Sequence, residues 1–323
     1  MSEQTTLFRD QPLFDAFEQQ VVQAWLPLEI SQISAGPYRG HLREIQLNNV
    51  SVFFEHQNCM VHKRGIMDEP FCTVSFARQT RGLTRLSEHI PQENSLFFIP
   101  SGTEFDVQAD SDVETVYFRF NQSHLLERAR AMNPRLWENS PDQALIFDVR
   151  NRKSLDAFAH QLYLHPLFQA GGEVFDYCES LSSSIMDRVL LTLDSSSAND
   201  GIHRDLIARR RARIQVNQAI AYIDAALEKG NCPSIVDICA GINVSQRNLQ
   251  YSFKKVLGLT PNAYLHRLRL NRVRVQLRRP DNMDVTVTQV ATHWHFWHLG
   301  RFSNDYLKLF GELPSVTLRR GFI

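Results

Sequence analysis

The stretch "VSQRNLQYSFKKVLGLTP", residues 244–261, decides the fold of the second half of the chain. Its apolar residues Leu249, Phe253 and Leu257 recur every four positions, which places them on one face of a helix. Gly258 follows, and glycine readily adopts the left-handed conformation that ends a helix. The stretch therefore predicts a capped helix with one buried face and one polar face.

The same pattern returns at an offset of 53 residues, without a gap, as "HLGRFSNDYLKLFGELP". There Phe302, Tyr306 and Phe310 occupy the apolar positions, and Gly311 follows them. A second, shorter apolar helix is expected before each copy. A short helix followed by a longer one that is polar outside is typical of a helix-turn-helix. The repeat predicts two such motifs, at about 234–257 and 286–310.

The turn inside each motif is expected to need a positive φ. The residues at the turns are Asn243 and His295, which adopt left-handed conformations more readily than most non-glycine residues. Ser245 is expected to cap the helix that follows the first turn.

The polar face of each longer helix carries long hydrogen-bonding side chains. Arginine bonds bidentately to guanine and glutamine to adenine, whereas a face that meets only water more often carries Glu and Lys. The pattern therefore favours DNA over solvent. The predicted DNA-binding residues are Gln246, Arg247, Gln250, Tyr251, Lys254, His298, Arg301, Ser303 and Asn304.

A long helix is predicted between the two motifs, from Pro261 up to the next breaker at Pro280. About 20 residues at 1.5 Å each give a rod of roughly 30 Å, close to the roughly 34 Å between successive major grooves on one face of DNA. Leu270, Val273 and Leu277 are expected to dock this rod to the motifs. The residues expected to contact phosphate are Arg267, Arg272, Arg274 and Arg278.

Charge divides the chain near residue 200. The formal net charge is zero, but residues 201–323 carry 19 Lys and Arg against 8 Asp and Glu, and the first 200 residues carry 16 against 27. A basic half indicates a nucleic-acid partner. The boundary coincides with a Ser-, Asn- and Asp-rich stretch, which predicts a linker at 194–205.

Upstream of that linker, residues 40–120 contain short alternating runs bounded by turn signals, which predict strands of a barrel or sandwich. In "VETVYFRF" the alternation predicts a half-buried strand. Helical periodicity follows near 123–132, 151–164 and 173–193. We therefore expect an α+β protein, with an N-terminal cupin-like β-barrel and flanking helices in residues 1–193 and an all-α domain of two motifs joined by a linker helix in residues 206–323.

The motifs "ICAGINVSQRNLQYSFKKVLGLTPNAYLHRLRL" and "VATHWHFWHLGRFSNDYLKLFGELP" resemble the DNA-binding domain of the AraC/XylS family of bacterial transcription regulators. The resemblance covers about a third of the chain. It implies two reading helices on one linker helix and promoter DNA and RNA polymerase as partners. On matching positions, Arg247, Gln250 and Tyr251 would read DNA in the first motif, and Arg301 and Asn304 in the second. Two departures concern the second motif: His295 stands where the family usually has Gly, and Asn304 replaces a commoner Arg.

The segment "YRGHLREIQLNNVSVFF" resembles, less specifically, the sensor domains of the subgroup that contains the activator of ethanolamine-utilisation genes. This resemblance implies a domain that binds a small-molecule effector or forms a homodimer. Ethanolamine itself is not carried over, because effectors diverge quickly. No effector-binding residue is assigned.

Two alternatives stay open. The first is a regulator controlled by protein contacts without a small ligand, because aromatic residues such as Phe53, Phe97 and Tyr117 either line a pocket or fill a core. The second is a metal-dependent cupin enzyme, but the barrel region has no His-x-His pair. We expect no catalytic residue, metal site or cofactor. Without an apolar run of about 18 residues, we expect a cytoplasmic protein that does not enter the membrane.

Overall fold

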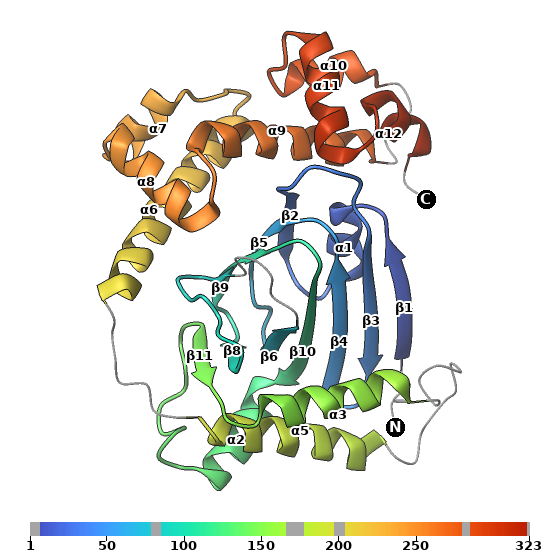
Figure 1. The fold of residues 1–323 in the computed structure, drawn as a ribbon, viewed down its shortest axis with the longest axis vertical. Helices are drawn as coiled ribbons and strands as arrows, with labels where there is room; N and C mark the ends of the chain where they lie inside the picture. Colours follow the sequence, from blue (N-terminus) through green and yellow to red (C-terminus); the bar gives the residue numbers. More distant parts are fainter. Residues whose placement is uncertain (1–6, 79–84, 166–177, 197–203, 280–284, 322–323) are drawn as a thin grey trace. The chain divides into compact units, whose positions relative to one another are not determined.

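The chain forms two compact units in the computed structural model (Figure 1). Unit 1 comprises Met1–Ile30 and Arg39–Asp200, and unit 2 comprises Ser31–Tyr38 and Gly201–Ile323. Most of the predicted linker, and the start of the helix predicted at 173–193, lie outside the described residues. The described residues are 7–78, 85–165, 178–196, 204–279 and 285–321.

Unit 1 is built from two antiparallel sheets. The larger has the strand order β1-β3-β4-β10-β6-β8-β11 and the smaller β2-β5-β9-β7. The strands are β1 (Leu7–Leu13), β2 (Leu28–Gln32), β3 (Gly40–Gln46), β4 (Val50–Gln57), β5 (Val61–Ile66), β6 (Phe71–Arg78), β7 (Arg85–Leu86), β8 (Ser95–Ile99), β9 (Glu104–Ala109), β10 (Val113–Asn121) and β11 (Leu145–Asp148).

The helices of unit 1 are α1 (Ala16–Val22), α2 (Gln122–Met132), α3 (Arg152–Leu164) and α5 (Cys178–Asp194). The predicted helices at 123–132 and 151–164 are confirmed as α2 and α3. Helices α3 and α5 lie along one side of the larger sheet (Figure 1). The core there joins Val116 and Phe118 of β10 with Leu155 of α3 and Val189 of α5. The predicted α+β class is confirmed.

The strand β10 is buried on both faces, so the prediction of a half-buried strand is wrong. Val116 and Phe118 face the helices, but Tyr117 and Arg119 on the other face are only 8% and 9% exposed. Tyr117 pairs with Phe53 of β4 across the ladder, and their rings stack with centroids 4.7 Å apart. The second face is buried because both sheets enclose a cavity, and a single strand cannot reveal a second sheet above it.

Unit 2 is helical outside its short N-terminal segment. Its helices are α6 (Arg204–Glu228), α7 (Ile235–Gly241), α8 (Gln246–Leu257), α9 (Pro261–Leu277), α10 (Val287–His293), α11 (Leu299–Phe310) and α12 (Pro314–Arg320). Both predicted pairs of helices are confirmed, as α7 with α8 and α10 with α11. We call these pairs the first and second modules.

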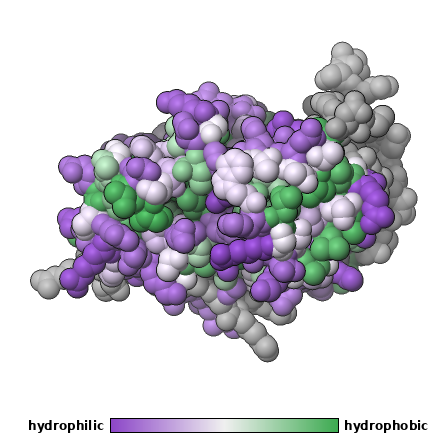
Figure 2. Space-filling view, turned by 90° about the horizontal axis from the view of Figure 1, so that it is seen from above, coloured by the Kyte–Doolittle hydropathy of each residue, from purple (hydrophilic) through white to green (hydrophobic). Residues whose placement is uncertain are grey.

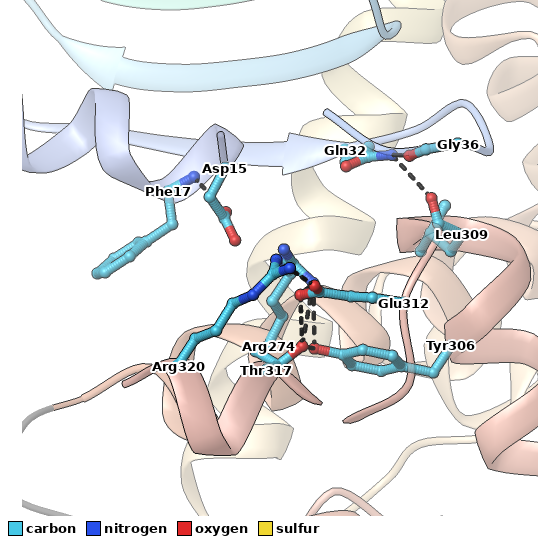
Figure 3. Close-up of polar contacts among 10 residues, drawn as sticks. All are labelled: Asp15, Phe17, Gln32, Gly36, Arg274, Tyr306, Leu309, Glu312, Thr317 and Arg320. Atoms are coloured by element: carbon cyan, nitrogen blue, oxygen red, sulfur yellow. Dashed lines mark hydrogen bonds and ion pairs between the residues drawn. The ribbon is translucent and has the colours of Figure 1, made fainter. Parts of the chain in front are cut away.

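The segment Ser31–Tyr38 belongs to unit 2 although it lies far from it in sequence. The Gln32 side-chain amide donates to the Leu309 carbonyl at 2.8 Å, and the Gly36 backbone N–H donates to the same carbonyl at 3.0 Å (Figure 3). Asn271 of α9 exchanges two hydrogen bonds with the Gln32 backbone, at 2.8 and 3.0 Å. The segment therefore supplies partners to the last turn of α11, whose carbonyls lack helical ones.

Candidate nucleic-acid interface

Local capping positions the first module. Ser234 and Asp237 form a capping box at the start of α7, and Ser245 accepts a hydrogen bond from the Asn248 backbone N–H at 3.3 Å. Hydrogen bonds from Ser234 lower the pKa of Asp237, which keeps that carboxylate ionised at the positive end of the helix. The predicted cap at Ser245 is confirmed.

The turn of each module has the predicted backbone. Asn243 has φ 53° and His295 has φ 63°, and both longer helices end at left-handed glycines, Gly258 and Gly311. The predicted positive φ values are therefore confirmed. The second module lacks one feature of the first, since its longer helix begins after His298, which makes no side-chain capping bond.

The polar face of α8 meets solvent along its length. Leu249, Phe253 and Leu257 are at most 3% exposed, as predicted, while Tyr251 is 58% exposed. The predicted DNA-binding residues of this module all lie in the exposed class, namely Gln246, Arg247, Gln250, Tyr251 and Lys254.

The second module presents a similar face on α11. Phe302, Tyr306 and Phe310 are buried, and the Arg301 side chain is 82% exposed. His298 and Asn304 are exposed as well, whereas Ser303 is half-buried. Arg301 approaches Asp305 at 3.7 Å, a surface pair on one helix that constrains it little. Both modules thus offer guanidinium and amide groups outward.

The rod α9 is shorter than predicted. It has 17 residues, about 25 Å at 1.5 Å per residue, and ends at Leu277 rather than near Pro280. Thr260 caps it and Pro261 occupies its first turn, as predicted. Leu270, Val273 and Leu277 pack in the core of the second module, as expected for docking on that side.

Two of the four predicted phosphate contacts are wrong. Arg274 and Arg278 are 6% and 8% exposed, so neither is free to meet a phosphate. Arg272 is half-buried and forms an ion pair with Asp224 of α6 at 3.2 Å. Arg267 is half-buried, and desolvation lowers the pKa of its guanidinium.

Arg274 instead lies in a polar network within the second module (Figure 3). Its Nη1 is 3.0 Å from Glu312 and 3.4 Å from the Tyr306 hydroxyl. Thr317 of α12 donates to Glu312 at 2.8 Å and accepts from Tyr306 at 3.0 Å. Arg320 donates to the other oxygen of Glu312 at 2.7 Å. This network was not predicted from the sequence. Helix α12 supplies two of its residues, and nothing in the sequence of α12 indicates that it packs near α9.

Two further features of the interface were not predicted from the sequence. Trp297, in the turn before α11, is 70% exposed, and such an aromatic group suits contact with a thymine methyl. At Gly241, a Cβ would lie 2.2 Å from the Tyr222 ring of α6, so any larger residue there would require that ring to move. The position of Trp297 within a histidine-rich turn was the sequence signal that could have indicated its role.

Figure 2 shows a face of the molecule on which hydrophilic side chains surround scattered apolar ones. Within the described residues, no group of three His, Cys, Asp or Glu side chains is arranged to hold a metal ion, and this includes His293 and His295. Among those same residues, no helix has the length and apolar character needed to cross a membrane.

Residues 238–320 match the helix-turn-helix domain family. Over 104 residues the chain is 35% identical to the probable thc operon regulatory protein of Rhodococcus erythropolis, covering 32% of this chain and 31% of that relative. Over 244 residues it is 27% identical to the XylDLEGF operon transcriptional activator 1 of Pseudomonas putida, covering 72% and 67%. The match thus spans about a third of the first relative and two thirds of the second. Both names describe regulators rather than enzymes.

Solved structures include similar chains. One is a probable AraC family transcriptional regulator from Rhodopseudomonas palustris, at 32% identity and TM-score 0.31, covering 34% of this chain and 99% of that one. Another is the AraC-like transcriptional activator CuxR, at 13% identity and TM-score 0.43, covering 81% and 94%.

Proposed function

We propose that the second half of this chain is an AraC/XylS-type helix-turn-helix domain, and that the protein is a sequence-specific transcription regulator that reads two adjacent major grooves of double-stranded DNA with each subunit. The observation that carries this proposal is the exposed polar face repeated on α8 and α11, each behind a left-handed turn. Arg247 and Arg301 are its central readers, with Gln250 and Asn304 beside them.

Contacts with the phosphate backbone of DNA would hold these base-reading residues in register with the base pairs. Arg267 and Arg272 remain candidates for phosphate contact, whereas the buried arginines of α9 do not. We expect the affinity for DNA to fall steeply as salt rises, because each neutralised phosphate releases counterions. An affinity that is flat against salt would contradict this role for the basic residues.

Unit 1 would supply control. We propose that residues 1–193 bind a small-molecule effector and join two chains into a homodimer in the cytoplasm, and that the DNA-bound protein activates transcription through RNA polymerase. The largely apolar cavity of unit 1 supports an effector over control by protein contacts alone. We retain in this proposal the resemblance of unit 1 to the sensor domains of the ethanolamine-operon subgroup. We do not propose ethanolamine as the effector.

Single substitutions test the readers. We expect Arg247→Ala and Arg301→Ala each to weaken binding of the cognate site by about 1 to 3 kcal/mol and to relax preference at one base pair. The measurement is fluorescence anisotropy with the cognate duplex and with duplexes changed at single positions. Arg319→Ala, exposed on α12, is the control and is expected to leave base preference unchanged. Unchanged base preference in both reader variants would refute the assignment.

A further inference from the structure

The cavity of unit 1 lies between the two sheets. Its volume is about 110 Å³. One wall comes from the larger sheet, with Ser75, Thr115 and Tyr117, and the opposite wall from the smaller sheet, with Phe105 and Val107. Most of the lining is apolar, and its four hydroxyl-bearing residues, Thr73, Ser75, Thr115 and Tyr117, all lie on the wall formed by the larger sheet. This arrangement suits a molecule that is apolar over most of its surface and polar at one edge.

Each charge at the cavity has a partner of opposite sign. The Lys63 ammonium is paired with the Glu55 carboxylate, and Glu55 also accepts a hydrogen bond from Gln19 of α1 at 2.7 Å. Arg85 contacts Asp106 at 2.7 Å, and His62 contacts the same carboxylate at 2.8 Å.

The Asp106 carboxylate stays charged within the fold. Burial acts to raise the pKa of Asp106, but Arg85 and His62 outweigh it and hold that pKa below its usual range. The carboxylate therefore remains ionised beside Arg85. A charged ligand would enter a site whose own charges are already neutralised, and it would lose its hydration without gaining a counter-ion.

Aromatic rings close one end of the cavity. Trp25 packs against Phe53 with ring centroids 5.2 Å apart, and Phe53 stacks on Tyr117. Arg119 covers Trp25 at 4.5 Å. The indole N–H of Trp25 is buried and has no acceptor among the described residues. A flat ligand could stack on these rings and accept a hydrogen bond from the Trp25 indole N–H.

Size narrows the ligand further. The cavity volume of about 110 Å³ is somewhat below the roughly 150 Å³ of a cavity that holds benzene, and far below the about 300 to 1,000 Å³ of pockets for drug-sized ligands, so the ligand has one ring at most. We propose that this cavity binds a small uncharged molecule of about one aromatic ring that carries a single polar group. The control of DNA binding by such a ligand rests on the proposed function. The binding of the ligand in the cavity does not depend on that function.

Three probes of nearly equal shape test the charge requirement on the full chain. They are benzamide, benzoate and benzylammonium, which are neutral, anionic and cationic at pH 7. We expect benzamide to bind and to raise the melting temperature by mass action, with both ions weaker by about tenfold or more. Isothermal titration calorimetry and thermal shift are the measurements, both made without DNA.

The variant Glu55→Gln removes the partner of Lys63 and leaves an uncompensated ammonium at the cavity. We expect its benzoate affinity to rise about tenfold relative to benzamide, because the anion then gains a counter-ion. Glu114→Gln, at an exposed position near the start of β10, is the matched control and is expected to keep the preference of the unchanged protein.

Two results would overturn this inference: tighter binding of either ion than of benzamide by the unchanged protein, or no binding of any of the three probes. Operator binding is measured on the same preparation by anisotropy. A protein that binds DNA but no probe refutes the cavity assignment alone, and one that binds benzamide but no DNA refutes the proposed function alone.

Discussion

The two helix-turn-helix modules share a sequence pattern but differ in what holds them. The first is fixed by local caps at Ser234 and Ser245 and packs against α6. The second has a capping box at Thr286 and Gln289 on α10 but no side-chain cap on α11, and it is held in addition by distant residues, namely the Arg274 network and the segment Ser31–Tyr38. Two modules can therefore share the same exposed polar face and still be stabilised by different contacts. The polar face would contact DNA, whereas the buried face packs against other parts of the chain.

Removing Arg274 is expected to have the largest effect. Arg274→Met leaves Glu312 without its buried partner, and we expect the free energy of unfolding of the full chain to fall by about 3 kcal/mol. Urea denaturation followed by circular dichroism measures it. Arg279→Ala, exposed just after the same helix, is the control, with a change within about 0.5 kcal/mol. Equal effects of the two substitutions would show that the network adds nothing.

Loosening the Ser31–Tyr38 segment is expected to act on one module only. Gln32→Ala removes the amide that bonds Leu309, and we expect a loss of about 1 to 2 kcal/mol. Hydrogen exchange should show faster exchange in the last turn of α11 and little change in α8. Gln218→Ala, exposed on α6, is the control. Faster exchange in both modules alike would contradict separate support.

The two left-handed turns offer a symmetric pair of substitutions. Asn243→Ala and His295→Ala are each expected to cost about 1 kcal/mol, because alanine disfavours a positive φ. The loss at His295 should be the larger, since its ring also bonds the Gly230 backbone. Asn243→Gly and His295→Gly should recover most of each loss in thermal unfolding. If the glycine variants are no more stable than the alanine ones, the backbone conformation is not the cause.

Acid is expected to weaken the second module by the smallest amount. Burial lowers the pKa of His266, and Arg269 and Arg301 add to this against the opposing charge of Asp305. With a folded pKa below the unfolded value of about 6.5, the unfolded chain binds the proton more readily, so stability falls as pH drops below about 6.5. His266→Gln should flatten this dependence in urea titrations between pH 7.5 and pH 5.5. An unchanged slope would exclude His266 as its source.

Strong local patterns made much of the fold predictable. Strands were expected within residues 40–120, and β4 and β9 lie there because their apolar runs end at turn signals. Missed elements had weaker signals. The edge strand "LFRDQPL" of β1 carries charges and a proline, and "VHKRGI" of β5 turns charged residues toward partners on other strands. Such charges resemble loop composition until their partners are known.

The candidate interface was predictable on its outer side only. Arg247 and Arg301 lie outward because the apolar residues that recur every four positions on the other side of each helix turn inward, and this holds for any helix with that pattern. Arg274 has the same side chain as Arg267 and Arg272, which are half-buried on α9, yet it is buried. Its burial depends on Glu312 and Thr317, some forty residues further on.

By itself the sequence determined the two modules, their left-handed turns and their polar faces, because helix periodicity, capping and positive φ are local properties that a few neighbouring residues settle. Three features follow from the folded structure alone: which arginines of α9 are buried, that residues 31–38 pack with the helical unit, and that a cavity with paired charges lies between the sheets. Those features depend on side chains far apart in sequence, whose burial and charge pairing emerge when the chain brings them together.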